Sequence, residues 1–85
     1  MKNEWLITFR SVTYAQRGER ILQNGKIPCR LHRTPKHLTE RGCGYCLRLR
    51  GLDAPAAVEL LHRNRLEYGK LYAVREDGST EERAL

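Results

Sequence analysis

The period of the apolar residues changes several times along the chain, and this pattern restricts the fold more than any other feature. Apolar side chains recur at every second position in Trp5–Phe9, Ile27–His32 and Tyr45–Arg50, which is typical of strands with one buried face. They recur at near-helical intervals up to Asn24 and again after Asp53. Leu71–Val74 is a further short strand candidate. The predicted order is therefore strand, helix, strand, strand, helix, strand.

This order predicts an α+β fold of the ferredoxin-like βαββαβ type, since two right-handed crossovers join its elements. The fold has a four-stranded antiparallel sheet with both helices on one face. A chain of 85 residues builds one domain with a modest core. We expect residues 1–75 to form a single ferredoxin-like domain. Residues 76–85 lack aromatic residues and any period, so we expect a flexible acidic C-terminal tail.

Local signals bound the two predicted helices. Ser11 or Thr13 offers an N-cap for the first helix, and Asn24 with Gly25 offers its C-terminal stop. Asp53 is expected to cap the second helix. Gly18 within the first helix costs about 1 kcal/mol relative to Ala, which indicates either a close approach of two elements or an imperfect helix.

Positive charge is concentrated before residue 76. Residues 1–75 hold 15 Lys and Arg against 6 Asp and Glu, a net charge of +9. A field of this sign attracts phosphates, acidic protein surfaces and anionic substrates. The sheet face away from the predicted helices is basic, because four of its residues are arginines. We expect this face to consist of Thr8, Arg10, Arg30, His32, Cys46, Arg48 and Arg50. The alternatives are a solvated polar face and a binding face that uses Arg10, Arg30, Arg48 and Arg50.

The cysteine count favours reduced thiols. Cys29, Cys43 and Cys46 are an odd number, and residues 1–4 show no secretion signal, so a disulfide framework is not expected. No apolar run approaches the roughly 18 residues that a membrane span requires. We therefore expect a cytoplasmic protein without membrane contact.

The segment Arg41-Gly42-Cys43-Gly44-Tyr45-Cys46 carries the sharpest chemical signal. The cations Lys36 and Arg41, with His37, lie in the same predicted loop and can lower the pKa of a thiol. Gly42 and Gly44 have no side chains that would block an incoming group. The backbone N–H groups around them can also point towards an anion. Cys43 is thus predicted to be an exposed nucleophile, with Cys46 able to form a local disulfide or resolve a modified Cys43. The alternative is that Cys43 is a small packing residue.

Three other interpretations of these residues fit less well. The set Cys29, His32, Cys43 and Cys46 has zinc-like spacing, but positions 29 and 32 of a strand point to opposite faces, so a zinc-stabilised fold stays a less favoured alternative. No metal and no cofactor is predicted. Cys46 leads into a strand, whereas a thioredoxin-type pair opens a helix. The segment 41–45 is similar to the signature of RNA-recognition motifs, but Cys43 and Arg48 stand where rings would stack.

The sequence resembles a family of small bacterial domains, the Se/S carrier protein-like family, from Trp5 to about Val74. Five segments carry the resemblance: Leu6-Ile7-Thr8-Phe9 followed by Ser11, Gly25-Lys26-Ile27-Pro28, Thr34-Pro35, Cys43-Gly44, and Tyr68-Gly69-Lys70-Leu71-Tyr72. The resemblance implies a ferredoxin-like fold and a carrier role in which one cysteine holds sulfur or selenium. The family's Cys-Gly step maps onto Cys43 and Gly44. Cys46 stands where family members usually have a small apolar residue, so the resemblance gives it no role.

Together these features predict a carrier rather than an enzyme with turnover of its own. Cys43 would hold a persulfide, or its selenium equivalent, received from a desulfurase or rhodanese-like donor, and would pass it to an acceptor protein. The alternative is a binding module that contacts RNA or an acidic protein through the basic sheet face.

Overall fold

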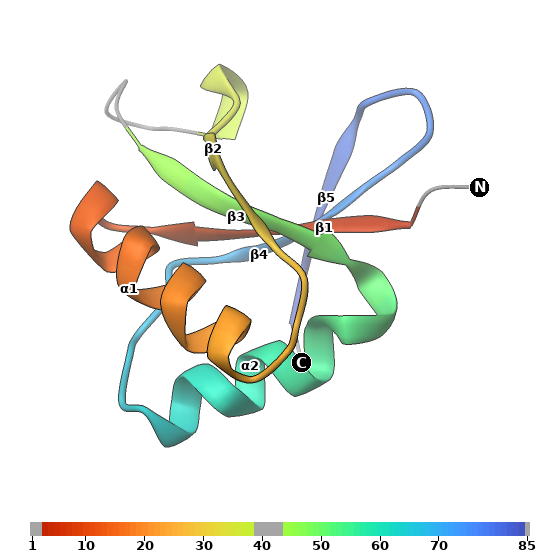
Figure 1. Ribbon diagram of the computed structural model, residues 1–85. Coiled ribbons are helices and arrows are strands. Elements are labelled where there is room, and N and C mark those ends of the chain that lie inside the picture. The colour runs from red at the N-terminus through yellow and green to blue at the C-terminus, as the bar shows by residue number, and fades with distance from the viewer. Residues whose placement is uncertain (1–2, 39–43, 85) are drawn as a thin grey trace.

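The computed structural model of the protein describes residues 3–38 and 44–84. Two helices cover one side of a five-stranded antiparallel sheet (Figure 1). The strands are β1 (Glu4–Phe9), β2 (Arg30–Arg33), β3 (Tyr45–Arg50), β4 (Leu71–Val74) and β5 (Thr80–Arg83). The helices are α1 (Val12–Asn24) and α2 (Ala54–Arg63), with short 3-10 turns η1 (Lys36–Leu38) and η2 (Gly51–Asp53). The strand order across the sheet is β2-β3-β1-β4-β5.

The core lies between the helices and the inner face of the sheet, which is the face turned towards α1 and α2. Ile7 and Phe9 of β1 point into it with Leu47 and Leu49 of β3, because side chains at every second strand position share a face. Leu22 of α1 and Leu61 of α2 close the core from the helical side, and both are fully buried. The predicted alternation in β1 and β3 is therefore confirmed. In β4, the inner residues are Leu71 and Ala73.

Ser11 caps α1, since its hydroxyl oxygen accepts a hydrogen bond from the Tyr14 N–H at 3.3 Å. Gly18 marks a close approach: a Cβ at this position would lie 2.8 Å from Cζ of Phe9. The predicted cap by Asp53 was wrong in its chemistry. Asp53 precedes α2 but makes no capping hydrogen bond, because its carboxylate accepts one from Nε of Arg50 at 2.9 Å.

The sequence prediction of four strands was wrong in number. Residues 76–85 were expected to form a tail, but Thr80–Arg83 pair with β4 as the edge strand β5. A reverse turn at 75–79 leads into β5, in which Arg75 N–H donates to the Ser79 carbonyl at 2.8 Å. Ion pairs from Lys70 to Glu82 and from Arg75 to Glu81 hold β5 against its neighbour. Neither helix in the described part of the chain is long and apolar enough to cross a membrane.

Candidate functional site

The segment between β2 and β3 is the one in which the sequence places Cys43. Its base is closed by a hydrogen bond of 3.1 Å from the Thr34 N–H to the Gly44 carbonyl, which continues the ladder between the two strands. Three of the predicted site residues, Arg41, Gly42 and Cys43, lie outside the described residues. Gly44 lies at the base itself, directly before β3. The backbone position next to Cys43 is thus fixed by the sheet.

Lys36 and His37 belong to η1, within this same segment. Both side chains are exposed. η1 lies on the side of the sheet opposite to the helices (Figure 1), which we call the outer face. Nε2 of His37 lies 3.1 Å from the Thr80 hydroxyl at the start of β5. The segment that carries Cys43 is thereby tied to an element distant in the sequence, a contact that sequence reasoning missed because it gave residue 80 no structure.

Cys46 points to the outer face but has no exposed surface. Both alternatives for this face, a solvated polar face and a binding face, require exposed side chains, and Cys46 does not meet this requirement. Leu6 on the same face is equally buried. Burial raises the pKa of the Cys46 thiol, and the opposing effects of a hydrogen bond with Thr34 and of the Arg48 charge are smaller. Cys46 is protonated at neutral pH and poorly placed to react.

Cys29 lies on the other side of the sheet. Its half-buried thiol packs against the core and donates a weak hydrogen bond to the Glu19 carbonyl of α1, with 3.9 Å from sulfur to oxygen. Burial, followed by the charge of Glu19, raises the pKa of Cys29 to about 11. Cys29 is also protonated at neutral pH.

The positions of Cys29 and Cys46 on opposite sides of the sheet argue against the zinc-like set of Cys29, His32, Cys43 and Cys46. His32 is the direct cross-strand partner of Cys46 on the outer face, whereas Cys29 contacts α1 on the inner side. The sheet thus separates two members of the predicted four-ligand set, as the strand geometry predicts. Within residues 3–38 and 44–84, no group of three His, Cys, Asp or Glu side chains is arranged to hold a metal ion.

The four arginines of the predicted binding face do not form one surface. Arg30 is the cross-strand partner of Arg48, and Arg50 follows on the same side of β3. Arg10 lies beyond the opposite end of β1, roughly 14 Å from Arg48 and 20 Å from Arg50 at the usual rise of a strand. Its guanidinium stacks over the Tyr14 ring of α1, 5.1 Å from the centroid, so Arg10 turns away from the other three.

Arg33 is a cation that sequence reasoning did not single out. It ends β2 opposite Tyr45, directly beside the Thr34–Gly44 base, and its guanidinium lies 6.0 Å from the Tyr45 ring centroid. Its place directly after the predicted strand Ile27–His32, before Thr34-Pro35, was the available signal. Arg33 adds positive charge at the base of the segment that contains Cys43.

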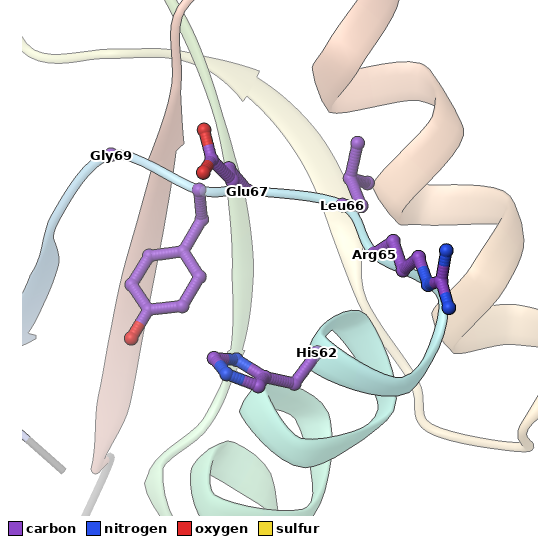
Figure 2. A pocket seen from close by; sticks show the side chains of 6 residues that line it. His62, Arg65, Leu66, Glu67 and Gly69 are labelled. Carbon is purple, nitrogen blue, oxygen red and sulfur yellow. The ribbon is translucent and has the colours of Figure 1, made fainter.

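A hollow of about 520 Å³ lies elsewhere, where α2 ends and the chain turns towards β4. Figure 2 shows that the side chains of Arg65 and Glu67 point away from the imidazole of His62. Leu66 faces the core and is nearly fully buried. The side chains of His62, Arg65 and Glu67 therefore do not converge on a common point.

The fold and the thiols define a class: a small α+β domain with one cysteine in the sequence that joins β2 to β3, and two other cysteines that are wholly or partly buried. The chain belongs to a family within this class. The family model described as "Putative Se/S carrier protein-like" matches residues 4–73, which confirms the resemblance found in the sequence. Comparisons with curated proteins and with solved structures give no significant match.

Proposed function

We propose that this protein is a sulfur or selenium carrier whose Cys43 holds the transferred atom. Membership of the Se/S carrier family supports a carrier role in general. The observation that supports Cys43 is the state of the other two cysteines of the chain. Cys29 and Cys46 both have raised pKa values caused mainly by burial, and sulfur transfer requires a thiolate that a partner can reach.

The proposed step is a thiol exchange. The Cys43 thiolate attacks the terminal sulfur of a donor persulfide, R–S–SH, and the S–S bond of the donor breaks as the new bond to Cys43 forms. The products are Cys43–S–SH and the donor thiolate, R–S⁻, so atoms, charge and electrons balance without an external oxidant. The donor is a desulfurase or a rhodanese-like protein. Attack by an acceptor on the bound sulfur then returns Cys43 to the thiolate.

The surroundings proposed for the thiolate are cationic. Lys36 and Arg41 share the segment with Cys43, and Arg33 stands at its base. Opposite charge near a thiol favours the thiolate. Gly42 and Gly44 leave the sulfur accessible. The ferredoxin-like arrangement of the sequence prediction belongs to the same proposal, with β5 as an addition beside β4, and the strand order β2-β3-β1-β4 is consistent with it.

The test is sulfur loading by a cysteine desulfurase with free cysteine, followed by mass spectrometry of the intact protein and of its peptides. The wild type is expected to gain one sulfur atom on Cys43, and Cys43→Ser is expected to gain none. Cys29→Ala and Cys46→Ala are the matched controls and should load like the wild type. Sulfur spread equally over Cys29 and Cys46, or loading that survives Cys43→Ser, contradicts the proposal.

A further inference from the structure

Arg30, Arg48 and Arg50 form an arrangement that costs stability. Arg30 and Arg48 are direct cross-strand partners on the outer face, and Arg50 is the diagonal neighbour of Arg30. Like charges in directly opposite positions of a sheet are destabilising. Glu4 partly compensates Arg48 at 3.2 Å, and Asp53 compensates Arg50 at 2.9 Å. Among the described residues, no carboxylate forms an ion pair with Arg30.

These arginines border a hollow of about 490 Å³, which we call the arginine groove. It forms where β2 begins at Arg30 while β3 continues to Arg50, so Leu49 and Arg50 have no β2 residue beside them. β2 is also an edge strand of the sheet. An edge strand leaves a row of backbone N–H and C=O groups available to an extended peptide. The groove therefore combines an open strand edge with positive charge.

We propose that the arginine groove binds an extended acidic segment of the protein that donates sulfur to this carrier or accepts it. The proposal rests on the carrier function proposed above. A carboxylate between Arg30 and Arg48 removes the repulsion of the cross-strand pair, because guanidinium groups bind carboxylates through paired, charge-assisted hydrogen bonds. A second acidic residue, two positions further along the segment, reaches Arg50, because residues two apart in a strand share a face.

The lining of the groove favours a protein segment over RNA. Recognition of single-stranded nucleic acid uses aromatic rings on which bases stack. Among the described residues that line the groove, His32 has the single aromatic ring, and there is no Phe, Tyr or Trp on which successive bases could stack. Glu4, which does line it, would repel a continuous row of phosphates. An acidic peptide has a charge only at chosen positions and can avoid Glu4.

The test compares two probes of equal charge with the wild-type protein: a labelled peptide in which Glu alternates with Val, and an oligouridylate. In the groove variant, Arg30→Gln, Arg48→Gln and Arg50→Gln are combined. In the control variant, Arg17→Gln, Arg20→Gln and Arg63→Gln are combined, which removes the same charge from other exposed positions. Peptide affinity is expected to fall about tenfold or more in the groove variant and less than about twofold in the control.

Two results overturn the proposal. One is a peptide affinity that falls equally in both variants, which indicates a general charge effect. The other is oligouridylate that binds more tightly than the peptide and is lost in the groove variant, which makes the groove a nucleic-acid site. Circular dichroism of each variant confirms that it is folded.

Loading of Cys43 by inorganic polysulfide separates this proposal from the carrier function. A small donor needs no docking surface, so the groove variant should load like the wild type while it loses the peptide. Peptide binding by Cys43→Ser, which cannot load, should equal that of the wild type. Loss of loading in the wild type defeats the carrier function, whereas retained loading with no peptide binding defeats the groove alone.

Discussion

At the scale of the residue, two thiols of this protein are held as protonated packing groups. Cys29 packs beneath β2 against α1, and Cys46 is closed off on the outer face beside Thr34. Both environments disfavour the thiolate, because burial removes the water that would solvate it. The difference between these thiols and the proposed carrier cysteine has consequences for stability as well as for reactivity.

The first prediction concerns alkaline pH. Cys29 holds its proton more tightly in the folded protein, with a pKa of about 11, than at its ordinary value of 9.0. Protonated Cys29 therefore stabilises the folded state fully below about pH 9, and this contribution is lost as the pH rises through 11. Urea unfolding should show a steeper loss of stability over this range for the wild type than for Cys29→Ala. Parallel pH profiles would mean that Cys29 is not held in this way.

The second prediction concerns Gly18. Alanine should gain about 1 kcal/mol from helix propensity, but overpacking of a core typically costs about 1–3 kcal/mol. The new methyl group would lie 2.8 Å from Cζ of Phe9 and 3.3 Å from Cδ1 of Leu47, and both side chains are buried. We expect Gly18→Ala to lower the free energy of unfolding by about 1 kcal/mol. Gln16→Ala, at an exposed position of α1, is the control. A more stable Gly18→Ala protein would show that the Phe9 ring yields easily.

At the scale of the element, the sequence predicts strands well where a buried face imposes a period. β3 and β4 have the predicted bounds, because Leu47 and Leu49, and then Leu71 and Ala73, must all face the core. β5 has no such face. Its residues are Thr80, Glu81, Glu82 and Arg83, and it is held by backbone pairing with β4 and by ion pairs. No hydrophobic pattern could have indicated it.

The candidate site was predictable in part for the same reason. Alternation places Cys46 on the outer face correctly, but it does not say that Cys46 is fully buried there and hydrogen-bonded to Thr34. It likewise groups Arg10 with Arg48, although the Tyr14 ring draws Arg10 towards α1. Contacts between distant segments, such as that of His37 with Thr80, depend on the folded chain and have no local signal.

The third prediction tests β5. Truncation after Arg75 removes four cross-strand pairs with β4, each worth roughly 0.2–1 kcal/mol, so the free energy of unfolding should fall by about 1–4 kcal/mol. Truncation after Arg83 keeps β5 and should leave stability close to that of the full chain. Urea unfolding of both proteins measures the difference. If the two truncated proteins are equally stable, residues 80–83 do not contribute to the stability of the sheet.

At the scale of the whole molecule, the two ends of the sheet differ in their proposed tasks. The segment with Cys43 leads into β3 at Tyr45, whereas Arg48 and Arg50 of the arginine groove lie three and five residues further along β3, roughly 10 to 17 Å away. A protein partner is large enough to engage both ends at once. A small sulfur donor engages only the loop.

The fourth prediction follows from this separation. Salt screens exposed charges, so the rate of sulfur transfer from a protein donor should fall several-fold as ionic strength rises from about 0.05 to 0.3 M. Loading by inorganic polysulfide should change much less, because it does not involve docking. Mass spectrometry of samples quenched at successive times gives both rates. In the groove variant, the rate with the protein donor should no longer depend on salt. If salt slows transfer from both donors equally, the groove does not attract the protein donor by its charge.

The proposed carrier function is tested most directly by the rate at which each cysteine of the native protein reacts with iodoacetamide at neutral pH. Mass spectrometry of the peptides gives the rate for each cysteine. We expect Cys43 to react at least about tenfold faster than Cys29 and Cys46, since only a thiolate attacks the reagent. The three rates should converge once the protein is unfolded in urea. A Cys43 that reacts as slowly as the two buried thiols in the native protein would contradict the proposed carrier function.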